Sequence, residues 1–311
     1  MQCKFKVYFK VVLKYFFVIC TLYFRKMFRY FIFILFISFC FGCSSNASDG
    51  EEAGFSKVWS ELQVEYDEVS SFFINKEIPF IAILPKSYND KDSFPVMYLL
   101  HNHGNNANVF LDSVPGLVDL VDKLQIVVIF INTAEGWYID SPRKQNWKYE
   151  TFITTELFPY IKKNYKINTT KEKTGITGFS MGGYGSIYLA FKHPEMFGYV
   201  GSVSGGMNLV EFPNLGNLSE VFGNQSLYLS DWKKHSPYYM LDSIDAKRLN
   251  FHFHLICGES DFFLNSNRAF SKKLDSLDVE HTYSEIEGIH KWNFARKMIV
   301  GQLKDFARST N

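Results

Sequence analysis

A serine between two glycines is the residue of this chain best suited to covalent chemistry. Ser180 stands in the pentapeptide GFSMG (178–182), which has the G-x-S-x-G spacing of a nucleophile elbow. There the serine occupies a strained strand-to-helix turn, so the residues two before and two after it must be small. An apolar strand pattern precedes the motif and an amphipathic helical pattern follows it. We therefore interpret Ser180 as a nucleophile rather than as an ordinary serine in a glycine-rich turn.

A carboxylic acid and a histidine follow Ser180 in the chain order that α/β-hydrolases use. Asp261 comes after the apolar run FHFHLIC, and His290 comes after the last strand pattern. We expect both in loops at the carboxyl ends of strands, with His290 as the general base and Asp261 orienting its imidazole. Two alternatives stay open: Glu259 could be the acid, and Asp261 could cap the following helix.

Acyl-transfer chemistry also needs hydrogen-bond donors for the oxyanion of the tetrahedral intermediate. The backbone N–H of Met181, directly after the nucleophile, is the expected first donor. The second donor is expected from the loop HNHG (101–104), which follows the apolar run VMYLL. Both donors must reach the same oxygen atom. This chemistry therefore requires the predicted strands at 96–100 and 174–178 to end side by side.

The elements that must position these residues alternate between strands and helices. Apolar runs predict strands at 96–100, 126–131, 174–178, 200–203, 251–257 and 280–286, and a hairpin at 61–66 and 80–84. Helices are predicted at 149–165, 183–192, 265–277 and 293–307, and 208–247 is interpreted as an insertion or cap. This order predicts an α/β-hydrolase fold, a mostly parallel sheet with helices on both faces and an antiparallel N-terminal hairpin.

The first 43 residues are predicted to be a lipoprotein signal, followed by a tether at 44–54 and one α/β domain at 55–311. Basic residues precede the apolar run YFIFILFISFCF, which ends at Gly42-Cys43. Cys43 is then expected to carry lipid and to anchor the exported chain to a bacterial envelope membrane. The alternative is a plain transmembrane anchor, although each apolar run is shorter than the roughly 20 residues that a spanning helix needs. A start at Met27 would leave a signal of ordinary length.

The composition beyond the signal argues against two other kinds of partner. Residues 44–311 hold 26 Lys/Arg against 32 Asp/Glu, a net charge of about −6 without a basic cluster, which argues against nucleic acid. Of the five cysteines only Cys257 stays inside the predicted domain, which excludes an intradomain disulfide and a cysteine metal cage.

Several segments, in this order, resemble one family of esterases: YLLHNHGNN, EGWYIDSP, KTGITGFSMGGYGS, CGESDFF and GIHKWNF. That family includes esterase D (S-formylglutathione hydrolase), tributyrin esterases, and feruloyl and acetylxylan esterases. The similarity spans about residues 55–307, and it implies an α/β-hydrolase fold without metal or cofactor. The site residues it implies are the triad Ser180, Asp261 and His290, and the oxyanion N–H groups of Met181 and His103.

The chain departs from this family at one position of the oxyanion loop. The family usually has His-Gly where this chain has His101-Asn102. Asparagine tolerates a left-handed backbone, so we expect the loop to keep its shape. The side chain of His103 either lends a donor near the acyl site or faces solvent, and we favour the second.

Two further groups of side chains have a functional and a structural interpretation. Trp137, Tyr138 and Asp140 lie in a segment that is near the active site in relatives, where they either line the substrate pocket or pack beneath the loop. His252 and His254 alternate on one strand. Two histidines without a third ligand nearby indicate buried core residues rather than a metal site.

The sequence therefore favours a serine esterase for short acyl or aromatic esters, including esters on polysaccharides. A sugar acyltransferase and an S-formylglutathione hydrolase-like thioesterase are the enzymatic alternatives. The lipoprotein signal indicates the outer membrane or the periplasmic face, whereas glutathione thioesters are cytosolic. A glycan-binding lipoprotein on an inactive hydrolase scaffold is disfavoured, because all three triad residues occur in order.

Overall fold

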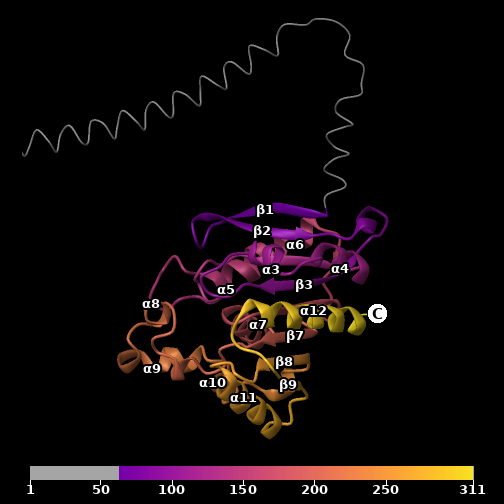
Figure 1. The fold of residues 1–311 in the computed structure, drawn as a ribbon. Coiled ribbons are helices and arrows are strands. Elements are labelled where there is room, and N and C mark those ends of the chain that lie inside the picture. Colours follow the sequence, from indigo (N-terminus) through magenta and orange to yellow (C-terminus); the bar gives the residue numbers. More distant parts are fainter. Residues whose placement is uncertain (1–62, 311) are drawn as a thin grey trace, which may run out of the picture. The chain divides into compact units, whose positions relative to one another are not determined.

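The computed structural model describes residues 63–310, which Figure 1 shows in colour. The predicted signal, the tether and Cys43 lie outside the described residues. Among the helices of residues 63–310, none has both the length and the apolar character needed to cross a membrane.

One twisted sheet organises residues 63–310, with the strand order β1-β2-β4-β3-β6-β7-β8-β9 and the short β5 paired to β3. Strands β3, β4 and β6 to β9 run parallel, whereas β1 and β2 form an antiparallel hairpin, with β2 antiparallel to β4. The strands are β1 Val64–Ser71, β2 Lys76–Ile83, β3 Phe94–Leu100, β4 Val127–Ile131, β5 Ile167–Asn168, β6 Thr174–Gly178, β7 Tyr199–Val203, β8 His252–Gly258 and β9 Thr282–Ile286. The predicted mostly parallel sheet with an antiparallel N-terminal hairpin is confirmed.

The two faces of the sheet carry two separate apolar clusters, as alternating side chains of a buried strand require. In β4, Val127 and Ile129 belong to one cluster, and Val128 and Phe130 belong to the other. Helices α3 Val109–Ser113, α4 Leu117–Leu124 and α12 Trp292–Ser309 cover one face. Helices α6 Phe158–Asn164, α7 Met181–Lys192 and α11 Leu264–Ser276 cover the other. Figure 1 shows α12, in yellow, beside β7.

Two helical regions differ from the sequence prediction. The helix expected at 149–165 is interrupted: α5 Tyr149–Thr151 and α6 enclose a π-helical turn at Phe152–Leu157. Helices α3 and α4 were not predicted, because they are short and stand among turn residues. Both are packed by the far larger α12, so tertiary contacts rather than propensity hold them.

The region interpreted as a cap forms short helices that dock on the loop after β4. It contains η4 Leu209–Glu211, α8 Leu218–Phe222, α9 Gln225–Lys234, α10 Pro237–Met240 and η5 Ala246–Arg248. The Ser141 hydroxyl donates to the Val221 carbonyl at 2.7 Å, and Arg143 pairs with Asp231. The cap is thus fixed to the segment that the sequence placed near the site.

The sheet reverses its strand order at β3, which has β4 on one side and β6 on the other. In open α/β sheets, ligands bind beyond the carboxyl ends of strands at such a switch point. Here the loop 101–104 follows β3 and the motif around Ser180 follows β6.

Candidate active site

Ser180 stands in the strained turn that the motif predicts, between β6 and α7. Its backbone has φ 58° and ψ −114°, and its N–H donates to the Val203 carbonyl at 2.9 Å. A Cβ on Gly182 would lie 1.9 Å from the Leu100 carbonyl oxygen. Glycine is therefore required there, because the elbow packs its backbone directly on the end of β3.

Ser180, His290 and Asp261 form a continuous hydrogen-bonded chain. The Ser180 Oγ lies 2.8 Å from His290 Nε2, and His290 Nδ1 lies 2.8 Å from Asp261 Oδ2. A carboxylate only accepts, so Nδ1 carries a proton and Nε2 can accept the serine proton. The Asp261 side chain is fully buried, and its Oδ1 accepts the Phe263 N–H at 2.9 Å. One carboxylate therefore orients the imidazole and also shapes the turn before α11.

The loops that carry Asp261 and His290 are tied to each other. The Ser260 N–H donates to the Gly288 carbonyl at 3.0 Å, and the Glu259 N–H donates to the Ile286 carbonyl at 2.9 Å. Glu259, the competing acid, is exposed, and among the described residues its carboxylate makes no hydrogen bond. The geometry therefore brings Asp261, not Glu259, to the imidazole.

Two backbone N–H groups near the serine are available as donors. Within residues 63–310, the amides of Met181 and His103 donate to no acceptor. Met181 begins α7, whose positive end adds to the attraction for an anion. Because β3 and β6 pair in register up to Leu100 and Gly178, the two loops that carry these amides start at neighbouring positions.

His101 holds the oxyanion loop from inside the protein. Its ring is fully buried, Nδ1 donates to the Asn102 carbonyl at 2.9 Å and Nε2 accepts the Thr133 N–H at 3.3 Å. Burial lowers the pKa of His101 to about 4, so the imidazole is neutral at pH 7. The left-handed residue of this loop is Gly104, at φ 75°, and Asn102 does not need that conformation. The replacement of the family's glycine is thereby accommodated.

The side chains expected near the substrate pocket are structural supports in this fold. Tyr138 is fully buried, and its hydroxyl donates to the His101 carbonyl at 2.9 Å. Asp140 accepts both the N–H and the hydroxyl of Thr151. Trp137, only 2% exposed, donates through its indole to Asn217 at 2.8 Å. The interpretation of packing beneath the loop holds for Trp137 and Tyr138, whose side chains are buried, whereas Asp140 is partly exposed and bonds to Thr151.

The His103 side chain is 30% exposed, in line with the favoured orientation toward solvent, and its Nε2 also lies 3.1 Å from the Oδ1 of Asn217 in the cap. No sequence pattern indicates this contact, because 114 residues separate the partners.

Exposed apolar side chains next to the histidine were not singled out from the sequence. Phe262 is 51% exposed and Ile289 is 49% exposed, and each directly adjoins a residue of the hydrogen-bonded chain. The Phe262 ring centroid lies 4.3 Å from that of His290 and 6.2 Å from that of Phe212 in the cap. The aromatic pair FF after the acid was the available sequence signal.

The interpretation of His252 and His254 as buried core residues is wrong. The His252 side chain is 46% exposed, and both rings contact the Asp305 carboxylate, at 3.0 and 2.8 Å. Among residues 63–310, no group of three or more His, Cys, Asp or Glu side chains is arranged to hold a metal ion.

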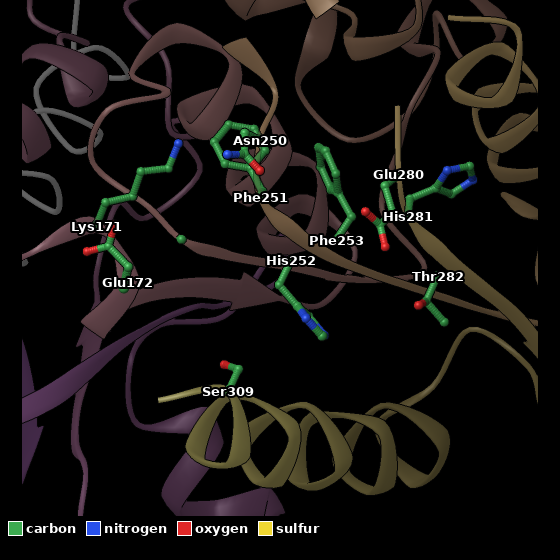
Figure 2. Close-up of a pocket in the computed structure, with 11 residues that line it drawn as sticks. Lys171, Glu172, Asn250, Phe251, His252, Phe253, Glu280, His281, Thr282 and Ser309 are labelled. Carbon is green, nitrogen blue, oxygen red and sulfur yellow. The ribbon is translucent and has the colours of Figure 1, made fainter. Parts of the chain in front are cut away.

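An open pocket of about 490 Å³ lies at the amino ends of strands β6 to β9 (Figure 2). Ser180, by contrast, follows the carboxyl end of β6. It is lined by His252 and Thr282, which begin β8 and β9, and by Lys171 and Gly198 before β6 and β7. The serine, acid and histidine all follow strand carboxyl ends, so this pocket is separate from their chemistry.

Cys257 does not compete with Ser180 as a nucleophile. Its thiol is buried, and burial raises its pKa to about 12, which keeps it protonated at pH 7.

A strained serine elbow at the switch point of a mostly parallel sheet, hydrogen-bonded to a histidine and a buried acid, defines a serine hydrolase of the α/β-hydrolase type. Residues 71–306 match the family described as "Putative esterase", and the chain belongs to that family. It is an enzyme of the esterase class, as the sequence predicted.

Named relatives agree with this assignment. An acetyl esterase of Caldicellulosiruptor saccharolyticus is 23% identical over 74% of this chain and 92% of its own length. An esterase of Mycobacterium tuberculosis is 27% identical over 67% of this chain, which spans only 51% of that relative. A ferulic acid esterase of known structure superposes with a TM-score of 0.68 at 25% identity, covering 79% of this chain and 98% of that one.

Proposed function

We propose that this chain hydrolyses short-chain acyl or aromatic carboxylic esters through an acyl-enzyme on Ser180. One observation carries the proposal: the unbroken chain of two 2.8 Å hydrogen bonds from the Ser180 hydroxyl through His290 to Asp261. The strained elbow and the family membership support it.

In the first half-reaction, Ser180 Oγ attacks the ester carbonyl while His290 Nε2 takes the hydroxyl proton. The N–H groups of Met181 and His103 stabilise the oxyanion, each contributing roughly 10²–10³ in turnover. The C–O bond to the alcohol then breaks, and His290 returns the proton to that leaving oxygen. Asp261 keeps Nδ1 protonated and stabilises the imidazolium.

In the second half-reaction, water gives a proton to His290 and attacks the acyl-enzyme, which releases the acid and restores Ser180. A sugar hydroxyl in the place of water would give acyl transfer instead. An activity panel of acetyl-xylan, methyl ferulate, tributyrin and S-formylglutathione, with and without a sugar acceptor, separates these reactions. The proposal predicts turnover of at least one oxygen ester, and a Ser180→Ala variant without it. Turnover of S-formylglutathione alone would contradict the proposal.

The exposed apolar side chains of Phe262 and Ile289, beside His290, support an aromatic or acyl substituent as part of the substrate. Phe262 presents its ring to solvent next to His290, where a bound ester must lie. An aromatic contact contributes about 1 kcal/mol, so Phe262→Ala should lower kcat/KM for methyl ferulate roughly fivefold. Activity toward p-nitrophenyl acetate should change less. Phe72→Ala, an 86% exposed phenylalanine on the β1–β2 turn, is the matched control.

We propose further that the chain is exported and anchored to the envelope through lipid on Cys43. The support is the sequence pattern of basic residues, apolar run and Gly42-Cys43. Metabolic labelling with a radioactive fatty acid should mark the wild-type chain and not Cys43→Ser, which should also leave the membrane fraction. Equal membrane association of both chains would contradict the anchor.

A further inference from the structure

The side chain of Asn217 joins three segments beside the proposed oxyanion site. Its Oδ1 accepts the indole N–H of Trp137 at 2.8 Å and lies 3.1 Å from His103 Nε2. Its Nδ2 donates to the Glu135 carbonyl at 3.1 Å. Asn217 is only 8% exposed, so the cap, the loop after β4 and the loop after β3 meet in one buried amide.

These contacts fix which atom donates and which accepts. An indole N–H only donates and a carbonyl only accepts, so the Asn217 oxygen must face Trp137 and the nitrogen must face Glu135. The remaining partner of the oxygen, His103 Nε2, must therefore carry a proton. The His103 ring is held as a donor, in one orientation.

The backbone next to Asn217 holds the same ring from a second side. Gly216 has φ 53°, and a Cβ at this position would lie 2.9 Å from His103 Nε2. The cap therefore touches His103 through one hydrogen bond and one close packing contact. A larger residue at Gly216 would force the ring away.

Two other cap contacts hold the loop after β4 and do not involve the loop 101–104. Lys144 pairs with Glu220 at 2.6 Å, and Ser141 bonds to Val221. Within residues 63–310, the only hydrogen bond between the cap and the loop 101–104 is that of Asn217 with His103.

We propose that Asn217 is a positioning residue that fixes His103, so that its backbone N–H meets the developing oxyanion. The inference rests on the proposed function of Ser180 and the oxyanion amides. It assigns the cap a role in catalysis: through Asn217, the cap supports stabilisation of the transition state. An interaction realised only in the transition state changes kcat, whereas a substrate contact changes KM.

The test compares kcat and KM for p-nitrophenyl acetate in Asn217→Ala and in His103→Ala, which keeps the backbone N–H. Loosening one oxyanion donor should remove part of the roughly 10²–10³ that such a donor contributes, so each variant should lower kcat about tenfold with KM nearly unchanged. Because both changes break the same contact, the double variant should lose no more than either single one. His103 is partly exposed, so His103→Ala should fold even where Asn217→Ala does not.

Asn208→Ala is the matched control. Asn208 is also a buried asparagine of the cap, 6% exposed, but its side chain bonds only to Val210 and Glu211 among the described residues, both within the cap. It should keep the wild-type kcat. The inference is overturned if KM rises while kcat stays, if Asn208→Ala matches Asn217→Ala, or if the two single losses multiply. A wild-type protein without esterase activity would instead contradict the proposed function, and so is a distinct result.

Discussion

The nucleophile elbow and the oxyanion loop follow neighbouring strands, β6 and β3, but different kinds of contact hold them. The elbow is shaped by its own backbone: Ser180 is strained, and Gly182 packs on the Leu100 carbonyl. The oxyanion loop is held by side chains from elsewhere, through Tyr138 to the His101 carbonyl and through Asn217 to His103. A site of this kind thus combines one locally encoded half with one half that depends on tertiary contacts.

Gly182→Ala should break the elbow and give the largest loss. A methyl group would lie 1.9 Å from the Leu100 carbonyl oxygen, and because the three nearest atoms all belong to the backbone of Leu100 and His101 they cannot easily give way. We expect a loss of more than about 3 kcal/mol in the free energy of unfolding, measured by denaturant titration, or no folded protein at all. Gly301→Ala in α12, where an added Cβ would meet nothing beyond its own helix backbone within 4 Å, should instead gain up to about 1 kcal/mol. Equal stability of the two variants would contradict the steric account.

Acid should loosen the oxyanion loop through His101. Its pKa is lowered by burial from 6.5 to about 4, so the unfolded chain takes up a proton first as the pH falls. The stability contributed by neutral His101 is complete above pH 6.5 and is lost toward pH 4, by at most about 3 kcal/mol. Denaturant unfolding of wild type and His101→Gln at pH 7, 5.5 and 4 measures this. The advantage of the wild type should shrink with acid, and a difference that stays constant would exclude His101 as the cause.

Tyr138→Phe should give the smallest effect. It should distinguish the contribution of the oxyanion loop to kcat from that of the elbow. The change removes the hydroxyl that donates to the His101 carbonyl, and the ring remains in place. Leaving a buried carbonyl without its donor costs about 1–2 kcal/mol of stability. We expect a several-fold lower kcat for p-nitrophenyl acetate with an unshifted acid limb of the pH–rate profile, which reports the protonation of the general base His290. A shifted limb would mean that the loop also controls the histidine.

The elbow half could be predicted from the sequence because its determinants are adjacent. Small residues at 178 and 182 are required by the turn itself, and the chain order of serine, acid and histidine follows from the strand order. Strands β3 and β4 could be predicted as well, since each is a continuous apolar run, whereas the two-residue β5 could not. Helices α3 and α4 could not, because they are short and depend on α12 for packing.

The side-chain contacts that hold the oxyanion loop could not be predicted, because the residues that make them are distant in sequence. Trp137 lies 80 residues from Asn217, and His103 lies 114 residues from it. Neither the aromatic character of Trp137 nor the polarity of Asn217 indicates which partner it meets. The exposure of Phe262 likewise depends on where the cap residue Phe212 comes to lie.

Covalent labelling of Ser180 tests the central claim most directly. The folded wild-type chain is treated with a fluorophosphonate, and the modified peptide is identified by mass spectrometry. We predict a single adduct on Ser180, absent in Ser180→Ala and formed at least 10³-fold more slowly in His290→Ala, because the histidine no longer takes the serine proton. An adduct on another residue, or a folded wild-type chain without any adduct, would contradict the account.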